Sequence, residues 1–289
     1  MRYGMPYRGS KNQIAKWVIE NLPKKENLYD LFGGGGAITH CACESGKFKH
    51  VYYNELYPIT FKGFDMAIHG KFNNENRWIS HDEFMEKRRT DPYVAICFSF
   101  GNNLRSYCYS EKAEKLKKAL HYAICFSDFK LLQDLGIELK TKISERIELT
   151  KQVKELLKLN NLQMQNLERL ERLESLQHLQ HLQHLYLTNK DYADVQIKEN
   201  SVIYCDPPYK NTEKYRMDFN HNEFYSWCES QKELTIISEY EMPQDRFISI
   251  AEKEKISLMR SANRTTKTEK LFVPKHQYQM YLDEMAVLK

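Results

Sequence analysis

The apolar residues of this chain fall into short runs that stop at polar, glycine or proline residues. Such runs occupy residues 28–32, 51–53, 202–205 and 234–238. A few apolar residues bounded by turn signals are typical of buried strands. A helix is predicted after the glycines at 33–36. Strands that alternate with helices predict a doubly wound α/β sheet.

The middle of the chain has a different pattern. Residues 95–100 (AICFSF) predict another buried strand, which leads into a loop at 101–107. Residues 111–120 (EKAEKLKKAL) have helical spacing with a basic surface, which is more often solvated than bound to phosphate. Residues 131–187 are rich in Leu, Gln, Glu, Lys and His, contain no proline and have no glycine after Gly136. This composition favours helix.

Leucines recur every third residue near the end of that segment. They are Leu167, Leu170, Leu173, Leu176, Leu179, Leu182 and Leu185. A spacing of three is neither the 3.5 of a coiled coil nor the 3.6 of an amphipathic helix, so a triplet-repeat backbone is an alternative to the favoured helix. His178, His181 and His184 share the spacing, but a duplicated Gln-His-Leu unit explains them and we predict no zinc site.

The most informative motif is Asp206-Pro207-Pro208-Tyr209, directly after an apolar run. Ligands of open α/β sheets bind at the carboxyl ends of strands. The Asp206 carboxylate and the Pro207 carbonyl can accept both hydrogens of an exocyclic amino group such as N6 of adenine, and Tyr209 can stack on the base. The alternative is an ordinary Pro-Pro turn with a capping aspartate.

A glycine tract supplies the second motif. The tract at 33–36 lets backbone pass close to a bound nucleoside, and Glu55 follows the next predicted strand. An acid so placed commonly binds a ribose hydroxyl. A nicotinamide dehydrogenase has similar spacing, but the G-x-G-x-x-G pattern fails because Thr39 stands at its last position. A plain glycine-rich loop is the other alternative.

Both motifs, in this order, resemble those of the Dam-type (D12 class) DNA adenine N6-methyltransferases, which use S-adenosylmethionine. Residues 7–11 (YRGSK), 30–36 (DLFGGGG), 55–58 (ELYP), 191–192 (DY) and 206–209 (DPPY) are similar to family segments. Two positions depart from the family pattern. Serine replaces the usual second glycine of the first segment, and glutamate stands at the ribose-binding position where aspartate is commoner.

The resemblance implies a Rossmann-like methyltransferase core formed by residues 1–60 and 186–289. The insert, predicted to be largely helical, would comprise a target-recognition region at 61–130 and the Leu-, Gln- and His-rich segment at 131–185. The implied cofactor-binding residues are Tyr7, Lys11, Asp30, Phe32, Gly33, Gly34, Gly36, Glu55, Asp191 and Tyr192. The implied catalytic residues are Asp206, Pro207, Pro208 and Tyr209.

Two loops are candidates for DNA contact. In the loop at 101–107, Asn102, Asn103 and Arg105 carry groups that bind base edges, and Tyr107 could stack on an extruded base. A Gly-Asn-Asn turn with surface tyrosines is the alternative. By position, residues 260–270 (RSANRTTKTEK) resemble a family segment near the target base, and a solvated loop is the alternative. The predicted contacts there are Arg264 and Lys267.

The predicted reaction transfers the methyl group of S-adenosylmethionine to N6 of a flipped adenine in double-stranded DNA, without a metal. An RNA adenine methyltransferase would keep the same tetrad. A protein-glutamine methyltransferase usually has Asn where this chain has Asp206, and a non-catalytic DNA-binding protein would not need the complete set of catalytic residues. No feature indicates a restriction endonuclease partner, although one is compatible with the sequence.

Composition agrees with a cytoplasmic enzyme. The chain has 289 residues, 42% of them hydrophobic, with a net charge of +4 and a pI of about 8.5. This charge is compatible with DNA binding. No apolar span reaches transmembrane length, and the first residues are not those of a signal peptide. The seven scattered cysteines are expected to be reduced thiols, and Cys205 is expected to lie in the core.

Overall fold

The computed structural model describes residues 3–137, 173–174, 176–209, 219–256 and 266–286. The chain divides into two compact units. The first, which we call the sheet unit, comprises residues 1–5, 9–65 and 181–289. The second, which we call the helical unit, comprises residues 6–8 and 66–180.

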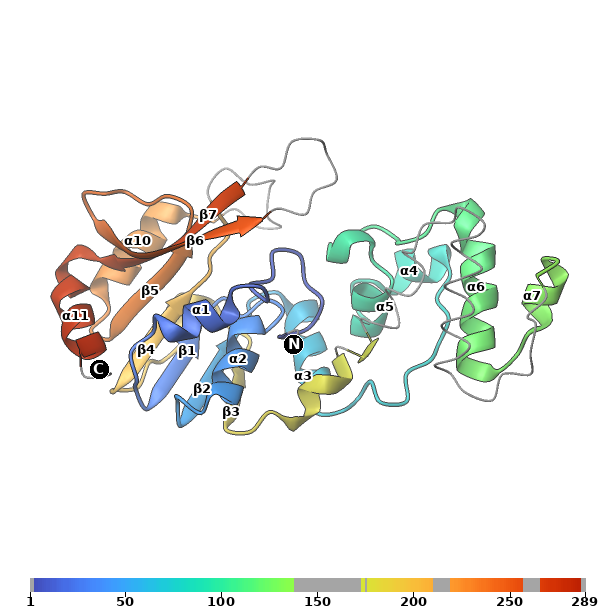
Figure 1. Cartoon of the computed structure of the whole chain (residues 1–289), viewed down its shortest axis with the longest axis horizontal. Helices are drawn as coiled ribbons and strands as arrows, with labels where there is room; N and C mark the ends of the chain where they lie inside the picture. Colours follow the sequence, from blue (N-terminus) through green and yellow to red (C-terminus); the bar gives the residue numbers. More distant parts are fainter. Residues whose placement is uncertain (1–2, 138–172, 175, 210–218, 257–265, 287–289) are drawn as a thin grey trace. The chain divides into compact units, whose positions relative to one another are not determined.

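A seven-stranded sheet with the order β3-β2-β1-β4-β5-β7-β6 forms the centre of the sheet unit (Figure 1). Neighbours among the first five strands in this order are parallel, and β7 is antiparallel to both β5 and β6. The strands are β1 (Asn27–Asp30), β2 (His50–Asn54), β3 (Leu185–Thr188), β4 (Ser201–Cys205), β5 (Leu234–Glu239), β6 (Phe247–Ile256) and β7 (Thr266–Pro274). The four runs predicted as buried strands are β1, β2, β4 and β5, and the Rossmann-like α/β prediction is confirmed.

Helices bury both faces of the central strands, as expected for a parallel sheet. One apolar cluster contains Leu28, Val202 and Leu234 together with residues of α1 (Ala15–Glu20) and α2 (Ala37–Ser45). The opposite cluster contains Tyr29, Ile203 and Cys205 together with residues of α10 (His221–Ser230). Cys205 is fully buried, so its prediction as a core thiol is confirmed. The other helices of this unit are α10 (His221–Ser230), α11 (Tyr278–Ala286) and the 3₁₀ helices η3 (Tyr192–Asp194) and η4 (Lys275–Gln277). Helix α3 (Pro58–Ile68) continues past residue 65.

The strand register brings the ends of β1, β2 and β4 to one edge. Asp30 pairs with Tyr53 on one side and Tyr204 on the other. Past the end of β1, the Leu31 amide donates to the Tyr204 carbonyl at 3.1 Å. The glycine tract and the Asp206–Tyr209 segment therefore leave the sheet at the same edge.

The helical unit contains α4 (His81–Lys87), α5 (Pro92–Cys97), α6 (Glu111–Phe126), α7 (Lys130–Asp134) and the 3₁₀ helices η1 (Phe100–Asn102) and η2 (His178–His181). The helix predicted at 111–120 is confirmed as part of α6. The strand predicted at 95–100 is wrong, because residues 92–97 form α5. Asp91 caps this helix by accepting from the Tyr93 and Val94 amides, and Pro92 occupies its first turn. A fully buried helix and a buried strand have the same run of apolar residues, so the cap decides between them.

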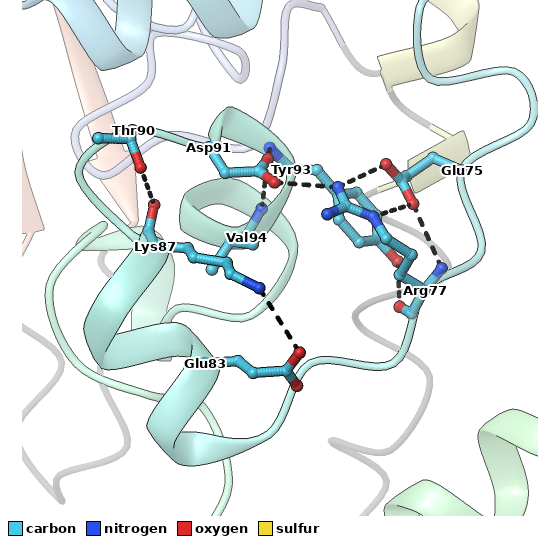
Figure 2. Close-up of polar contacts among 8 residues, drawn as sticks. All are labelled: Glu75, Arg77, Glu83, Lys87, Thr90, Asp91, Tyr93 and Val94. Atoms are coloured by element: carbon cyan, nitrogen blue, oxygen red, sulfur yellow. Dashed lines mark hydrogen bonds and ion pairs between the residues drawn. The ribbon is translucent and has the colours of Figure 1, made fainter.

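An arginine connects the segment before α4 to the start of α5 (Figure 2). The Arg77 guanidinium donates two hydrogen bonds to Glu75, at 2.9 and 2.7 Å, and lies 3.0 Å from Asp91. The Tyr93 hydroxyl donates to the Arg77 carbonyl at 2.8 Å, and the guanidinium lies over the Tyr93 ring. The hydrogen bonds to Glu75 raise the pKa of Arg77. This arginine therefore has a structural role inside the unit.

Within residues 131–187, the structure describes 131–137, 173–174 and 176–187, and the helix predicted for residues 138–172 lies outside the described residues. Leu173, Leu176 and Leu179 are buried. The helix prediction is wrong at the end of the segment, because Leu185 begins β3 and pairs with Val51 of β2. Pairing with an existing strand overrides helix propensity here.

Candidate active site

The Asp206 carboxylate lies immediately after β4 and binds a buried lysine. Lys11 Nζ donates to Asp206 Oδ1 at 2.6 Å and to Oδ2 at 2.7 Å. Burial raises the pKa of Asp206, the Lys11 ammonium lowers it, and the nearby Glu269 carboxylate raises it again. Asp206 and Lys11 are 195 positions apart in the sequence, and the fold brings them into direct contact.

Tyr209 completes this group together with a residue that the sequence reasoning missed. The Tyr209 hydroxyl donates to Glu269, and the Tyr209 ring packs edge-on against Tyr240 with centroids 4.7 Å apart. Lys11 Nζ lies 4.6 Å from the Tyr209 ring centroid and 3.7 Å from Glu269 Oε1. Burial raises the pKa of Tyr209 well above its usual range, so the phenol stays protonated.

Glu269 lies on β7, within the segment predicted as a basic loop. That prediction is wrong for residues 266–270, because β7 pairs with β6 along this stretch and with β5 from Lys270 onward. Alternation along the strand could have identified the acid, since Glu269 shares its strand face with Leu271 and Val273, which are fully buried. Arg264 lies outside the described residues, as does the Lys267 side chain.

The two prolines fix the backbone between Asp206 and Tyr209. Pro207 is buried, and the Pro208 carbonyl accepts a hydrogen bond from His221 Nε2 at 3.0 Å. His221 is the first residue of α10. The direction of the backbone after Pro207 is therefore set both by the proline rings and by this contact.

The glycine tract turns tightly after β1. The Gly33 amide donates to the Asn54 carbonyl at 2.8 Å, and the Gly36 amide donates to the Gly33 carbonyl at 2.7 Å. A Cβ added to Gly33 would lie 2.2 Å from the Tyr53 ring, and one added to Gly36 would lie 2.1 Å from the Phe64 ring. Gly36 also has a left-handed backbone, with φ +71°. These two positions therefore require glycine because of packing within the protein, in addition to any approach of a ligand.

Glu55 follows β2 and is held by two backbone amides. Its Oε2 accepts from the Gly34 amide at 2.9 Å, and its Oε1 accepts from the Tyr57 amide at 2.7 Å. The carboxylate is thus fixed beside the glycine tract. This is the arrangement in which an acid at the end of β2 can bind the hydroxyl groups of a ribose.

Four other residues predicted to bind the cofactor lie in the same unit. Asp30 is buried, and its carboxylate faces Thr39 in the first turn of α2. Tyr192 packs against Phe32 with ring centroids 5.2 Å apart, and Asp191 caps η3 by accepting from the Ala193 amide. The structure therefore gathers Phe32 and Tyr192 into one aromatic group. Tyr7 falls within the helical unit, and its role stays a prediction.

The predicted DNA-binding loop lies in the helical unit. Some of its side chains make contacts within the protein and others are exposed. Asn103 Oδ1 accepts from the Arg105 and Ser106 amides, at 2.8 and 2.9 Å. The Tyr107 hydroxyl donates to the Ile79 carbonyl, and its ring packs among other aromatic residues. Asn103 and Tyr107 thus make structural contacts, whereas Arg105 is exposed. Asn102 is half-buried with φ +57°.

The lysines of α6 also differ. Lys115 and Lys118 are exposed, but Lys117 is buried, with its ammonium 5.5 Å from the Tyr109 ring centroid. Among the described residues, no group of three or more His, Cys, Asp or Glu side chains is arranged to hold a metal ion. None of the helices in the described part of the chain has the length and apolar character needed to cross a membrane.

Comparison with known proteins shows the family of the chain. The model of the D12 class N6 adenine-specific DNA methyltransferases matches residues 7–280, so the chain is an S-adenosylmethionine-dependent methyltransferase. It belongs to the D12 class N6 adenine-specific DNA methyltransferase family. A comparison with curated proteins found no match.

Two solved structures are similar to the chain at low identity. The rRNA methyltransferase aviRa from Streptomyces viridochromogenes has 9% identity and a TM-score of 0.40, over 91% of this chain and 84% of that chain. A Haemophilus influenzae protein assigned as a methylase has 13% identity and a TM-score of 0.31, over 90% of this chain and 94% of that chain.

The chemistry of the residues at this sheet edge fits S-adenosylmethionine. Glu55 would supply a fixed carboxylate for ribose hydroxyls, and Phe32 with Tyr192 would supply aromatic surface for a purine. The glycine tract supplies compact backbone beside both. When bound, the cofactor supplies an electrophilic methyl group on a sulfonium centre.

Proposed function

We propose that this protein methylates N6 of an adenine that has been flipped out of double-stranded DNA. One observation carries the proposal. The Asp206–Tyr209 segment and the glycine tract leave adjacent parallel strands at the same edge, with the Leu31 amide bonded to the Tyr204 carbonyl. The residues predicted to bind the target base and those predicted to bind the cofactor therefore border one another.

The proposed chemistry depends on positioning and electrostatics. The Asp206 carboxylate and the Pro207 carbonyl would accept the two N6 hydrogens, which directs the nitrogen lone pair toward the methyl group. Holding the two reacting atoms in line supplies much of the rate enhancement, and the half-buried Asp206 carboxylate stabilises the positive charge that develops on N6. The proton passes from N6 to water once the methyl is attached, since the methylated nitrogen is then strongly acidic.

Tyr209 would stack on the flipped adenine. Its hydroxyl is bound to Glu269 and its ring packs edge-on against Tyr240, so the orientation of the ring is fixed before a base arrives. A ring held in advance loses little conformational entropy when the base stacks on it. A flipped base also carries an unstacking cost of a few kcal/mol, which such stacking offsets.

The helical unit would supply the DNA contacts. Arg105 is the residue best suited to a base edge, because it is exposed and guanidinium groups bind guanine bidentately. Lys115 and Lys118 are exposed on one helix and would contact phosphates. The buried Lys117 and the structural Arg77 are not part of this proposal.

The proposal is tested by measuring methyl transfer from labelled S-adenosylmethionine to duplex DNA and to RNA of the same sequence. The product nucleoside is then identified by mass spectrometry. We expect N6-methyladenine in DNA, and roughly a hundredfold less product or lower with the Asp206→Ala variant. Methylation of RNA with none of DNA would support the alternative substrate, and methylation of neither would remove the proposed activity.

A further inference from the structure

The active-site lysine lies between the half-buried Asp206 carboxylate and the buried Glu269 carboxylate. Lys11 Nζ is 2.6 and 2.7 Å from the Asp206 oxygens and 3.7 Å from Glu269 Oε1. Side-chain exposure is 7% for Lys11 and 1% for Glu269, so neither charge is stabilised by bulk water. A buried charge requires an oppositely charged partner. The Lys11 ammonium has a second carboxylate, Glu269, within a short movement.

The arrangement creates a conflict for the proposed reaction. Both Asp206 oxygens are occupied by Lys11, yet Asp206 is the group that must accept a hydrogen of the target amine. A carboxylate oxygen can accept more than one hydrogen bond, but an ammonium held across both oxygens competes with the amine for the carboxylate charge. We therefore expect Lys11 to leave at least one oxygen when the base enters. If Lys11 had no other partner, this release would leave a buried ammonium uncompensated, which is strongly unfavourable.

Glu269 resolves this conflict. We propose that Glu269 is a positioning residue that receives the Lys11 ammonium when the target amino group takes its place on Asp206. The inference rests on the proposed function, because it assigns Asp206 to the amine. The movement needed is small, since the ammonium is already close to Glu269 and lies over the Tyr209 ring at 4.6 Å from its centroid.

The Glu269 carboxylate is held in place for this role. It accepts a hydrogen bond from the Tyr209 hydroxyl. Glu269 therefore fixes the stacking ring and also provides the alternative site for the Lys11 ammonium. β7, which carries Glu269, pairs with β5 from Ile237 to Glu239. The carboxylate therefore stands on a paired strand and not on a flexible loop, although the surrounding sequence is polar and basic.

Glu269→Gln removes the negative charge but keeps the hydrogen-bond acceptor for Tyr209. The amide oxygen can still accept from Tyr209, but it cannot neutralise an ammonium. We expect the turnover number to fall roughly tenfold or more, with the cofactor dissociation constant changed by less than about twofold. Glu252→Gln is the matched control, because it makes the same change at a side chain that is 53% exposed on the neighbouring strand, and its turnover should equal that of the wild type.

The pH profile gives a signature that a purely structural role would not produce. Because the Glu269 charge raises the pKa of Asp206, its removal should move the acid limb of the turnover profile to lower pH. This variant keeps the other ionisable side chains that interact electrostatically with Asp206. They are Lys11, Asp30, Tyr204, Cys205, Tyr209 and Tyr240.

A double-mutant cycle of melting temperatures tests the same inference without an activity measurement. Asp206→Asn neutralises the first partner of Lys11, so the ammonium should depend on Glu269 in that background. We expect the melting temperature of the Asp206→Asn, Glu269→Gln double variant to fall by more than the sum of the two single shifts, because Lys11 then loses the charge of both carboxylates that it contacts here. Replacing Lys11 with Met in addition should recover part of the loss.

The outcomes separate the inference from the proposed function. Additive melting shifts, or a wild-type turnover and pH profile in Glu269→Gln, would overturn the role of Glu269 even if the enzyme methylates DNA. A non-additive cycle in a protein that methylates no adenine would support the shared lysine while removing the reaction assigned to it.

Discussion

Asp30 and Thr39 connect the end of the first strand to the start of the helix after the glycine tract. The Asp30 Oδ2 atom accepts from the Thr39 amide at 3.2 Å and from its hydroxyl at 2.7 Å. The intervening glycines are therefore closed into a loop whose two ends are bound to each other. Met5 adds a further contact, because its amide donates to the Gly35 carbonyl at 2.7 Å.

This contact predicts a pH-dependent stability. Burial raises the pKa of Asp30 from 3.8 to about 7. Between these values the native state keeps a proton that the unfolded chain releases, so the free energy of unfolding falls as pH rises through this window. For a single group the slope is at most about 1.4 kcal/mol per pH unit. Asp30→Asn is neutral at every pH and should remove this slope.

Urea unfolding of the wild type and Asp30→Asn at several pH values between about 5 and 8 measures the difference. Asp194→Asn is the control, because this aspartate is exposed and its substitution should leave the slope unchanged. Parallel pH dependence for the wild type and Asp30→Asn would show that Asp30 is ionised throughout this range.

A second prediction separates packing from cofactor binding in the glycine tract. Gly36→Ala places a Cβ where the Phe64 ring lies and imposes a side chain on a left-handed backbone. We expect a loss of about 2–4 kcal/mol of unfolding free energy, from overpacking and backbone strain together. In a Phe64→Ala background the overpacking disappears, so the same substitution should cost only the backbone part, about 1–2 kcal/mol. Equal costs in both backgrounds would argue against the packing explanation.

Much of the sheet could be predicted from sequence, because a buried parallel strand has a short apolar run with a clear end. Asp206 could be placed for the same reason, since it directly follows such a run. The residues at 95–100 could not be assigned by apolar content alone, because the deciding feature is the helix cap at Asp91. Glu269 was missed because its segment is polar and basic, and only its strand alternation with Leu271 indicates burial.

The packing that requires glycine at positions 33 and 36 could not be predicted from the sequence either. Each depends on an aromatic ring from a distant position, Tyr53 for one and Phe64 for the other. The Lys11 contact with Asp206 crosses nearly the whole chain and depends on the strand order. Contacts of this kind follow from topology, which local patterns do not specify.

Asp206 provides the third prediction. Asp206→Ala should reduce methyl transfer by roughly a hundredfold or more, because it removes an acceptor and a stabilising charge at the reacting nitrogen. Cofactor affinity should change by only about a few-fold, because Asp206 is assigned to the target base. Radiolabelled methyl transfer measures the first quantity and calorimetric titration with S-adenosylmethionine measures the second. A variant that retains full activity would end the mechanism proposed for this carboxylate.

The last prediction separates sequence reading from phosphate binding in the helical unit. Arg105→Ala should cost about 1–3 kcal/mol against the preferred site and relax the preference at one base pair, since an exposed guanidinium can bind a base edge bidentately. Lys118→Ala should weaken binding to all DNA sequences alike and reduce the salt dependence by about one counterion. Asn103→Ala is the structural comparison, because its side chain accepts from two backbone amides of the turn and should affect stability first.

Methylation across a library of randomised sites at two salt concentrations distinguishes these cases. If Arg105 reads a base, its variant should show a changed site preference at both salt concentrations. The Lys118 variant should keep the preference, and its loss of activity relative to the wild type should be larger at the lower salt concentration. If the Arg105 variant keeps the parent preference and loses only total activity, its guanidinium contacts the backbone of the DNA. Recognition must then be sought among the remaining exposed residues of the helical unit, because the Asn103 and Tyr107 side chains are already engaged in holding the loop.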